Sequence, residues 1–310
     1  MSSTTAVLMM AYGGPDSLDD VAPYLLDVRG GRATSEALIA EVRNRYAEIG
    51  GKSPLLEITC RQAQALQATL NAAGAGEYCV YVGMRHWRPY IRQAVERIAS
   101  DGIHQITAIC MTPFSSSMST GAYFDHLDRA IAAQQDDANW RRAVEVKKIG
   151  AWYTHPGYIQ AIAANLRAAL MEQPGAFVLF TAHSLPAALS EQGDPYATQF
   201  EHLARLVAQK AGLNESQWQS CFQSAGAQST RWLGPSLEET IRQAAKERNT
   251  SLLVAPIGFV SDHVEVLYDI DIEARRIAAA EGIHLQRTAS LNDQPLFIQA
   301  LSEIVLRGDS

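Results

Sequence analysis

The sequence predicts an α/β protein of two similar lobes, each built from a parallel β-sheet flanked by helices. Two observations support this fold class. Short apolar segments of strand length alternate with amphipathic helical segments along the 310 residues, a pattern typical of parallel sheets covered by helices. The order of elements in the first half also recurs in the second, because residues 84–114 and 230–259 match in element order and length, although weakly in identity.

The first half alternates apolar strands with helices. A helix is predicted over 35–49, because Ser35 is a suitable N-cap and Gly50–Gly51 a suitable stop. The strand and helix pairs are predicted at 6–13 and 17–30, at 78–84 and 88–102, and at 106–114 and 120–134.

The second half repeats this order, beginning with the apolar strand 176–186. The lobes are predicted to span residues 1–148 and 149–310 and to join near 146–160. The elements predicted after the first strand are the helix 194–212, the strand 220–226, the helix 235–248, the strand 251–259 and the helix 263–282.

The composition excludes several classes of protein. The formal net charge is −7 and no Lys/Arg-rich tract is present, which argues against nucleic acid as a partner. The apolar runs are of strand length and no basic region precedes the first one, so we expect no membrane-spanning helix, no signal peptide and a cytoplasmic protein. The four cysteines form no CxxC motif, which argues against disulfides or a cysteine-held metal. We expect a monomer, because each lobe already buries both faces of its sheet.

Four segments that follow predicted strands are expected to line one cleft between the lobes. In doubly wound sheets, ligands bind beyond the carboxyl ends of the strands. Tyr12 follows the first strand of the first lobe, and His183 follows the first strand of the second. Residues 112–117 and 258–265 follow later strands.

Acidic side chains recur at helical spacing near the C-terminus, at Asp262, Glu265, Asp269 and Glu273. Like charges at these spacings destabilise a helix slightly, so the stripe suggests a role with cations or protons. The alternative is a solvated acidic face, and the spacing alone favours that alternative.

His183 ends an apolar strand, where a single histidine is more often structural than a ligand. Together with a carboxylate such as Glu265, it would form an open site for a divalent metal. Neutral imidazole suits Fe²⁺, and the carboxylate adds an oxygen ligand or a proton acceptor.

The first lobe carries arginine and hydroxyl residues suited to carboxylate ligands, namely Arg29, Arg45, Tyr46 and Ser53. Guanidinium groups and nearby hydroxyls hydrogen-bond carboxylates well. Tyr46 lies on the apolar face of the predicted helix 35–49 and Arg45 at its edge, so both are expected to point inward. The alternative is that the arginines are ordinary surface residues.

Several motifs together resemble the ferrochelatase family along nearly the whole chain. TAHSLP and SDHVEVLYDID are the most specific of them. The matching segments are 10–15, 45–55, 155–159, 181–186, 223–235 and 258–271. The chain resembles most the soluble bacterial branch that inserts iron into coproporphyrin III, because Tyr12 stands near the place where members acting on protoporphyrin commonly have Met. The resemblance implies Rossmann-like lobes of the chelatase type.

The resemblance also implies roles for individual residues. Tyr12 would be the axial ligand to product iron. His183 and Glu265 would be the catalytic pair that handles incoming Fe²⁺ and the departing pyrrole protons. Asp269 and Glu273 would continue as a proton relay or an outer cation site. The residues implied at the porphyrin propionates are Arg29, Arg45, Tyr46, Ser53 and Tyr123.

The implied activity belongs to haem biosynthesis, with a porphyrin and Fe²⁺ as substrates and no permanently bound cofactor. No [2Fe–2S] cluster is expected, because no cysteine follows Cys221. Gly30 follows Arg29 where some relatives have a second Arg, which would weaken the carboxylate grip. Three alternatives remain: a protoporphyrin IX ferrochelatase, a related chelatase loading cobalt or nickel, and a non-catalytic haem or porphyrin carrier.

Overall fold

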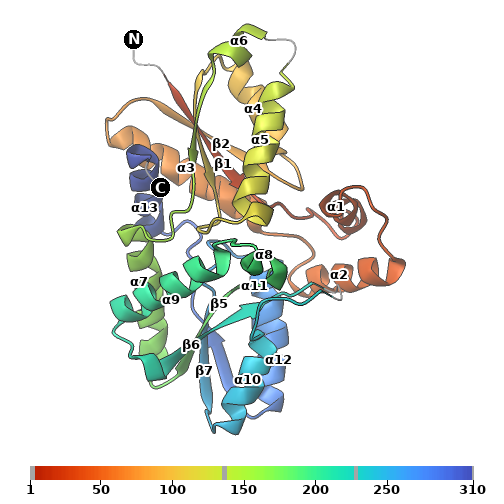
Figure 1. The fold of residues 1–310 in the computed structure, drawn as a ribbon, viewed down its shortest axis with the longest axis vertical. Coiled ribbons are helices and arrows are strands. Elements are labelled where there is room, and N and C mark those ends of the chain that lie inside the picture. Colours follow the sequence, from red (N-terminus) through yellow and green to blue (C-terminus); the bar gives the residue numbers. More distant parts are fainter. Residues whose placement is uncertain (1–3, 135–137, 227–229, 309–310) are drawn as a thin grey trace. The chain divides into compact units, whose positions relative to one another are not determined.

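The chain folds into two compact units, seen in a computed structural model that describes residues 4–134, 138–226 and 230–308 (Figure 1). The first unit contains the described residues up to Trp152 together with those from Asn292 onward. The second unit contains Tyr153–Leu291. No helix within the described residues is long and apolar enough to cross a bilayer.

The first unit is built on a four-stranded parallel sheet with the strand order β2-β1-β3-β4. Alternate side chains of β1 point to opposite faces, and both faces are buried, as expected for a central parallel strand. The strands are β1 (Thr5–Ala11), β2 (Tyr78–Met84), β3 (Gln105–Cys110) and β4 (Glu145–Ile149).

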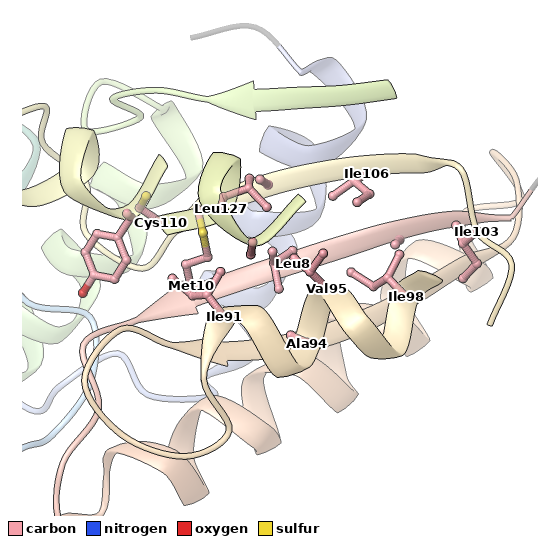
Figure 2. Close-up of a cluster of buried hydrophobic side chains, with 14 of the residues drawn as sticks. Leu8, Met10, Ile91, Ala94, Val95, Ile98, Ile103, Ile106, Cys110 and Leu127 are labelled. Carbon is pink, nitrogen blue, oxygen red and sulfur yellow. The ribbon is translucent and has the colours of Figure 1, made fainter. Parts of the chain in front are cut away.

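Helices cover both faces of this sheet. On one face, Leu8 and Met10 of β1 pack against Val95 of α4 and Leu127 of α5 (Figure 2). α3 packs against β2, and α13 packs against α3. The helices of the first unit are α1 (Val21–Val28), α2 (Glu36–Glu48), α3 (Leu55–Ala72), α4 (Ile91–Ser100), the π-helix Ser117–Gly121, α5 (Ala122–Ala132), α6 (Ala138–Ala143) and α13 (Pro295–Arg307).

The second unit repeats the architecture, with the parallel strand order β6-β5-β7-β8. Its strands are β5 (Phe177–His183), β6 (Trp218–Gln223), β7 (Ser251–Ala255) and β8 (His284–Arg287). Its helices are α7 (Pro156–Glu172), α8 (Ala187–Glu191), α9 (Tyr196–Ala211), the 3₁₀ turn Glu215–Gln217, α10 (Leu237–Lys246), α11 (Val264–Leu267), the π-helix Asp269–Ala274 and α12 (Arg275–Ala280).

The predicted internal repeat is confirmed in detail. A cis proline, Pro89 or Pro235, follows the second strand of each unit and precedes α4 or α10. The carbonyl of Pro89 accepts from the backbone N–H of Met84 at 2.6 Å, and that of Pro235 accepts from Phe222 at 2.8 Å. The two parallel sheets, together with this repeated order of elements, confirm the prediction of two α/β lobes.

The structure differs from the sequence prediction in several places, and it contains α3, α7 and β8, which the prediction did not name. The last helix, α13, belongs to the first unit and not to a second lobe 149–310, because its apolar face packs on α3. Residues 145–149, expected near the junction of the lobes, form the edge strand β4, whose outward polar side chains gave no apolar signal. The predicted helix 263–282 is divided into α11, a π-helix and α12.

Candidate functional site

The strand order reverses at the same place in each unit, and two of the predicted site residues, Tyr12 and His183, lie there. β1 has β2 on one side and β3 on the other, and β5 likewise lies between β6 and β7. A crevice opens beyond the carboxyl ends of parallel strands at such a reversal, and ligands bind there. Tyr12 follows β1 directly, and His183 is the last residue of β5.

His183 and Glu265 meet beyond the carboxyl ends of β5 and β7. His183 Nδ1 lies 3.0 Å from Glu265 Oε2, and the two side chains are 32% and 31% exposed. His263 Nε2 approaches the same carboxylate oxygen at 3.6 Å. When Nδ1 carries the proton shared with Glu265, Nε2 of His183 is the nitrogen left for a metal.

The protonation of this pair follows from its surroundings. Burial by itself would lower the pKa of His183, but the charge of Glu265 and its hydrogen bond outweigh burial and raise that pKa. Burial would raise the pKa of Glu265, but the charge and hydrogen bond of His183, followed by His263, hold that pKa well below its usual range. Both shifts stabilise the charged forms of the pair, so a metal at His183 competes with a proton.

Neighbouring elements hold this pair in place through hydrogen bonds that are buried or partly buried. The side-chain amide of Gln223 donates to the backbone carbonyl of Glu265 at 2.7 Å and accepts from the hydroxyl of Thr181 at 2.6 Å. The hydroxyl of Tyr196 donates to the backbone carbonyl of His183 at 2.9 Å. Both members of the pair are therefore fixed through their backbones as well as their side chains.

Gly258 allows β5 and the segment after β7 to approach closely. Its N–H donates to the carbonyl of Thr181, and a Cβ placed on it would lie 2.8 Å from Cα and 2.7 Å from Cβ of Ala182. Since Ala182 precedes His183, we expect Gly258→Ala to destabilise the fold by about 1–3 kcal/mol through overpacking. Urea unfolding measures this loss.

The matched control is Gly121→Ala. Gly121 has a helical φ of −57°, and its Cβ would meet an atom only at 3.4 Å, so this change should cost no stability. A Gly258→Ala protein as stable as the parent would contradict the close approach.

The four acidic residues do not form one helical stripe. Asp262 lies before α11 and pairs with Arg287 at 3.3 Å, while Glu265 pairs with His183. Asp269 is buried and accepts a hydrogen bond from the hydroxyl of Ser224. Glu273 is exposed, and its N–H donates to the carbonyl of Tyr268, five residues earlier, as in a π-helix.

Tyr12 packs, with its ring tilted, against a histidine that the sequence prediction did not include. The rings of Tyr12 and His86 lie 4.7 Å apart between centroids, and the Tyr12 side chain is 40% exposed. Asp27 Oδ1 lies 2.9 Å from His86 Nδ1, and the hydroxyl of Tyr90 donates to the other oxygen of Asp27 at 3.2 Å. The His86 ring, against which the phenol at the end of β1 packs, is thus held in place by Asp27.

The residues predicted to bind carboxylates fall into separate places within the first unit. Tyr46 and Ser53 are both buried beside Gly14, whose added Cβ would meet the Ser53 hydroxyl at 2.5 Å and that of Tyr46 at 3.6 Å. Arg45 pairs with Glu41 of the same helix at 2.9 Å.

Of the two other residues predicted to bind carboxylates, Arg29 lies at the end of α1 and Tyr123 lies within α5. Arg29 follows α1, and its buried Nε has no hydrogen-bond partner among the described residues. Tyr123 is buried in α5 with the guanidinium of Arg85 over its ring at 5.7 Å. The Arg85 side chain also donates to the backbone carbonyl of Met118, in the π-helix before α5.

Sequence reasoning missed residues that act on the site from neighbouring strands. His86 and Gln223 lie at or just after the second strand of each unit, β2 and β6. Strand pairing places Gln223 opposite His183. The signal that could have found these two residues is a polar side chain at the carboxyl end of every predicted strand, and not of the first strand alone. Across the described ranges, no group of three or more His, Cys, Asp or Glu side chains is arranged to hold a metal ion.

Known proteins resemble this chain over its whole length. The family model described as ferrochelatase matches residues 4–308. A ferrochelatase of Deinococcus radiodurans is 42% identical over 97% of this chain and 95% of its own length. A coproporphyrin III ferrochelatase of Geobacillus kaustophilus is 38% identical over 99% of this chain and 96% of its own. The solved structure of SirB from Bacillus subtilis with Fe³⁺ covers 99% of this chain and 96% of its own, with a TM-score of 0.59 at 11% identity, which is a likeness of fold. The chain belongs to the ferrochelatase family.

Proposed function

We propose that this ferrochelatase inserts Fe²⁺ into coproporphyrin III to give Fe-coproporphyrin III. The observation that carries the choice of substrate branch is Tyr12, a partly exposed phenol directly after β1 that packs against His86. A phenolate oxygen is a suitable axial ligand for the iron of the product. Relatives from two Geobacillus species carry the name coproporphyrin III ferrochelatase, which supports the proposal.

The second unit supplies the chemistry with iron. Fe²⁺ binds Nε2 of His183, whose Nδ1 is held by Glu265. Insertion releases two pyrrole protons, and the carboxylate of Glu265 is the nearest acceptor to His183. Asp269 and Glu273 follow on the same segment, and they pass protons onward or hold an outer cation.

The first unit supplies the groups that bind the tetrapyrrole. The buried Nε of Arg29 still has a donor to offer, and a propionate would accept from it. The hydroxyls of Tyr46, Ser53 and Tyr123 serve the other propionates. Binding energy from these remote groups supports distortion of the ring toward the geometry that accepts a metal.

Anaerobic Fe²⁺ insertion into coproporphyrin III and protoporphyrin IX, followed by absorbance in parallel, tests the proposal. Faster turnover of coproporphyrin III supports it. A preference for protoporphyrin IX would overturn the assignment of the substrate and keep the reaction. Tight binding of haem without turnover of either porphyrin would favour a carrier.

We expect Tyr12→Phe to change the visible spectrum of the iron-bound product complex, because the phenolate ligand is lost while the ring contact with His86 remains. Stability should stay within about 0.5 kcal/mol of the parent, as is usual for a partly exposed side chain. Absorbance of the product complex and urea unfolding provide the two measurements. Tyr81→Phe is the control, because it also removes a tyrosine hydroxyl, but one that hydrogen-bonds Asp101 and is not a proposed iron ligand. An unchanged product spectrum in Tyr12→Phe would rule out the phenol as a ligand.

A further inference from the structure

Arg287, at the end of the edge strand β8, grips two carboxylates of the segment that carries Glu265. Its Nε and one terminal nitrogen bind the two oxygens of Asp271 at 3.0 and 2.8 Å. Its other terminal nitrogen lies 3.3 Å from Asp262 and 3.0 Å from the hydroxyl of Ser290. Ser290 in turn donates to Asp262 at 2.7 Å.

In the sequence, the two carboxylates that Arg287 binds lie on either side of Glu265 and Asp269. Asp262 precedes Glu265 by three residues, and Asp271 follows Asp269 by two. The short α11 and the start of the π-helix lie between the two gripped points. α11 has four residues and is followed, after Tyr268, by a π-helix, so this helical segment is irregular beside Glu265 and contacts from outside it help to fix the direction of the Glu265 side chain.

The grip has the character of a fixed contact. The side chains of Arg287, Asp271 and Asp262 are 12%, 19% and 22% exposed, which limits the competition from water. The planar guanidinium matches a carboxylate in two parallel hydrogen bonds and still has donors for a second group. A lysine at this position could carry the charge but could not span both carboxylates in this way.

We propose that Arg287 is a positioning residue for iron insertion: it fixes the segment 262–271 at both ends, so that Glu265 meets His183. Arg287 touches neither His183 nor Glu265, and it acts through the backbone that joins the two aspartates. The inference rests on the proposed role of Glu265 in insertion.

The first experiment compares Arg287→Met, Arg287→Lys and the control Arg242→Met. Arg242 also contacts two carboxylates of the second unit, Glu238 at 2.5 Å and Glu281 at 3.8 Å, but it is half exposed and lies outside the segment. Arg287→Met should slow Fe²⁺ insertion about 10- to 100-fold, as for loss of an outer partner of a metal ligand. Arg287→Lys should fall between Arg287→Met and the parent, and Arg242→Met should match the parent.

Three further readouts separate positioning from folding. Tetrapyrrole affinity, measured by fluorescence quenching, should be unchanged in Arg287→Met, while the KM for Fe²⁺ or kcat changes. The NMR signal of the proton between His183 and Glu265, assigned by its absence in His183→Ala, should disappear in Arg287→Met and remain in Arg242→Met. Urea unfolding records how much stability each variant loses.

A compensated variant separates the two explanations most sharply. Asp262→Asn and Asp271→Asn combined with Arg287→Met leave no unpaired buried charge, so the stability lost in Arg287→Met should largely return. If Arg287 positions Glu265, insertion stays slow and the NMR signal stays absent despite the recovered stability. Recovery of insertion together with stability would overturn the proposal.

Failure of the proposed function would be visible separately. If the parent protein inserts iron into protoporphyrin IX only, the comparison of variants is made with that porphyrin. If it inserts iron into neither, the NMR signal decides the inference alone: its loss in Arg287→Met supports positioning, and its retention overturns it.

Discussion

His183→Ala should abolish iron insertion while leaving a folded protein that still binds porphyrin. The change removes the nitrogen proposed to bind Fe²⁺, and it removes the largest of the influences that lower the pKa of Glu265. We expect the insertion rate to fall by more than about 100-fold. Loss of a residue that only hydrogen-bonds a metal ligand already lowers activity by about 10- to 100-fold, and His183 is proposed as the ligand itself. Anaerobic insertion assays with saturating porphyrin measure this loss.

The stability of the His183→Ala protein should fall only modestly. Glu265 loses its partner at 3.0 Å but keeps His263 at 3.6 Å, and its side chain is about a third exposed, so water replaces part of the lost interaction. We expect a loss of about 1–2 kcal/mol by urea unfolding, at the low end for an unsatisfied polar group. His202→Ala, in the exposed part of α9, is the matched control and should keep full activity. Near-normal insertion in a folded His183→Ala protein would remove His183 from the mechanism.

The fold was predictable where apolar runs carry the signal. The segments that became β1, β3, β5 and β7 are almost wholly buried, and continuous apolar residues marked them. The edge strand β4 was missed because most of its side chains face water. The position of α13 could not follow from local pattern, because the helix packs on α3, more than 200 residues earlier in the chain. The side chain of Gln62, in α3, donates to the carbonyl of Asn292 just before α13, a residue 230 positions away.

The candidate site was predictable in residue types and only partly in geometry. His183 and Glu265 were paired in the prediction, and they lie in contact. The helical spacing of Asp262 and Glu265 suggested one common face, but Asp262 lies outside the helix because Arg287 and Ser290 hold it. A sequence pattern gives the intrinsic period of a helix and cannot show a distant arginine that competes for one of its residues.

Glu265→Gln should separate proton transfer from iron binding. The amide keeps a hydrogen-bond acceptor for His183 Nδ1 but carries no charge and accepts no pyrrole proton. Without the carboxylate, burial dominates the pKa of His183 and lowers it, so the imidazole is neutral and Nε2 is available to a metal at neutral pH. Iron should therefore still reach the site.

We expect insertion by Glu265→Gln to be slower by about 10²–10⁴-fold, the range for loss of a general base, with porphyrin affinity unchanged. Single-turnover absorbance with porphyrin bound before Fe²⁺ is added measures the chemical step, and fluorescence quenching measures porphyrin binding. Glu281→Gln is the matched control, because Glu281 lies in the same unit and its carboxylate faces the half-exposed Arg242 at 3.8 Å, away from His183. An unchanged single-turnover rate in Glu265→Gln would assign proton removal to another group, and weaker porphyrin binding with a normal rate would make Glu265 a substrate contact.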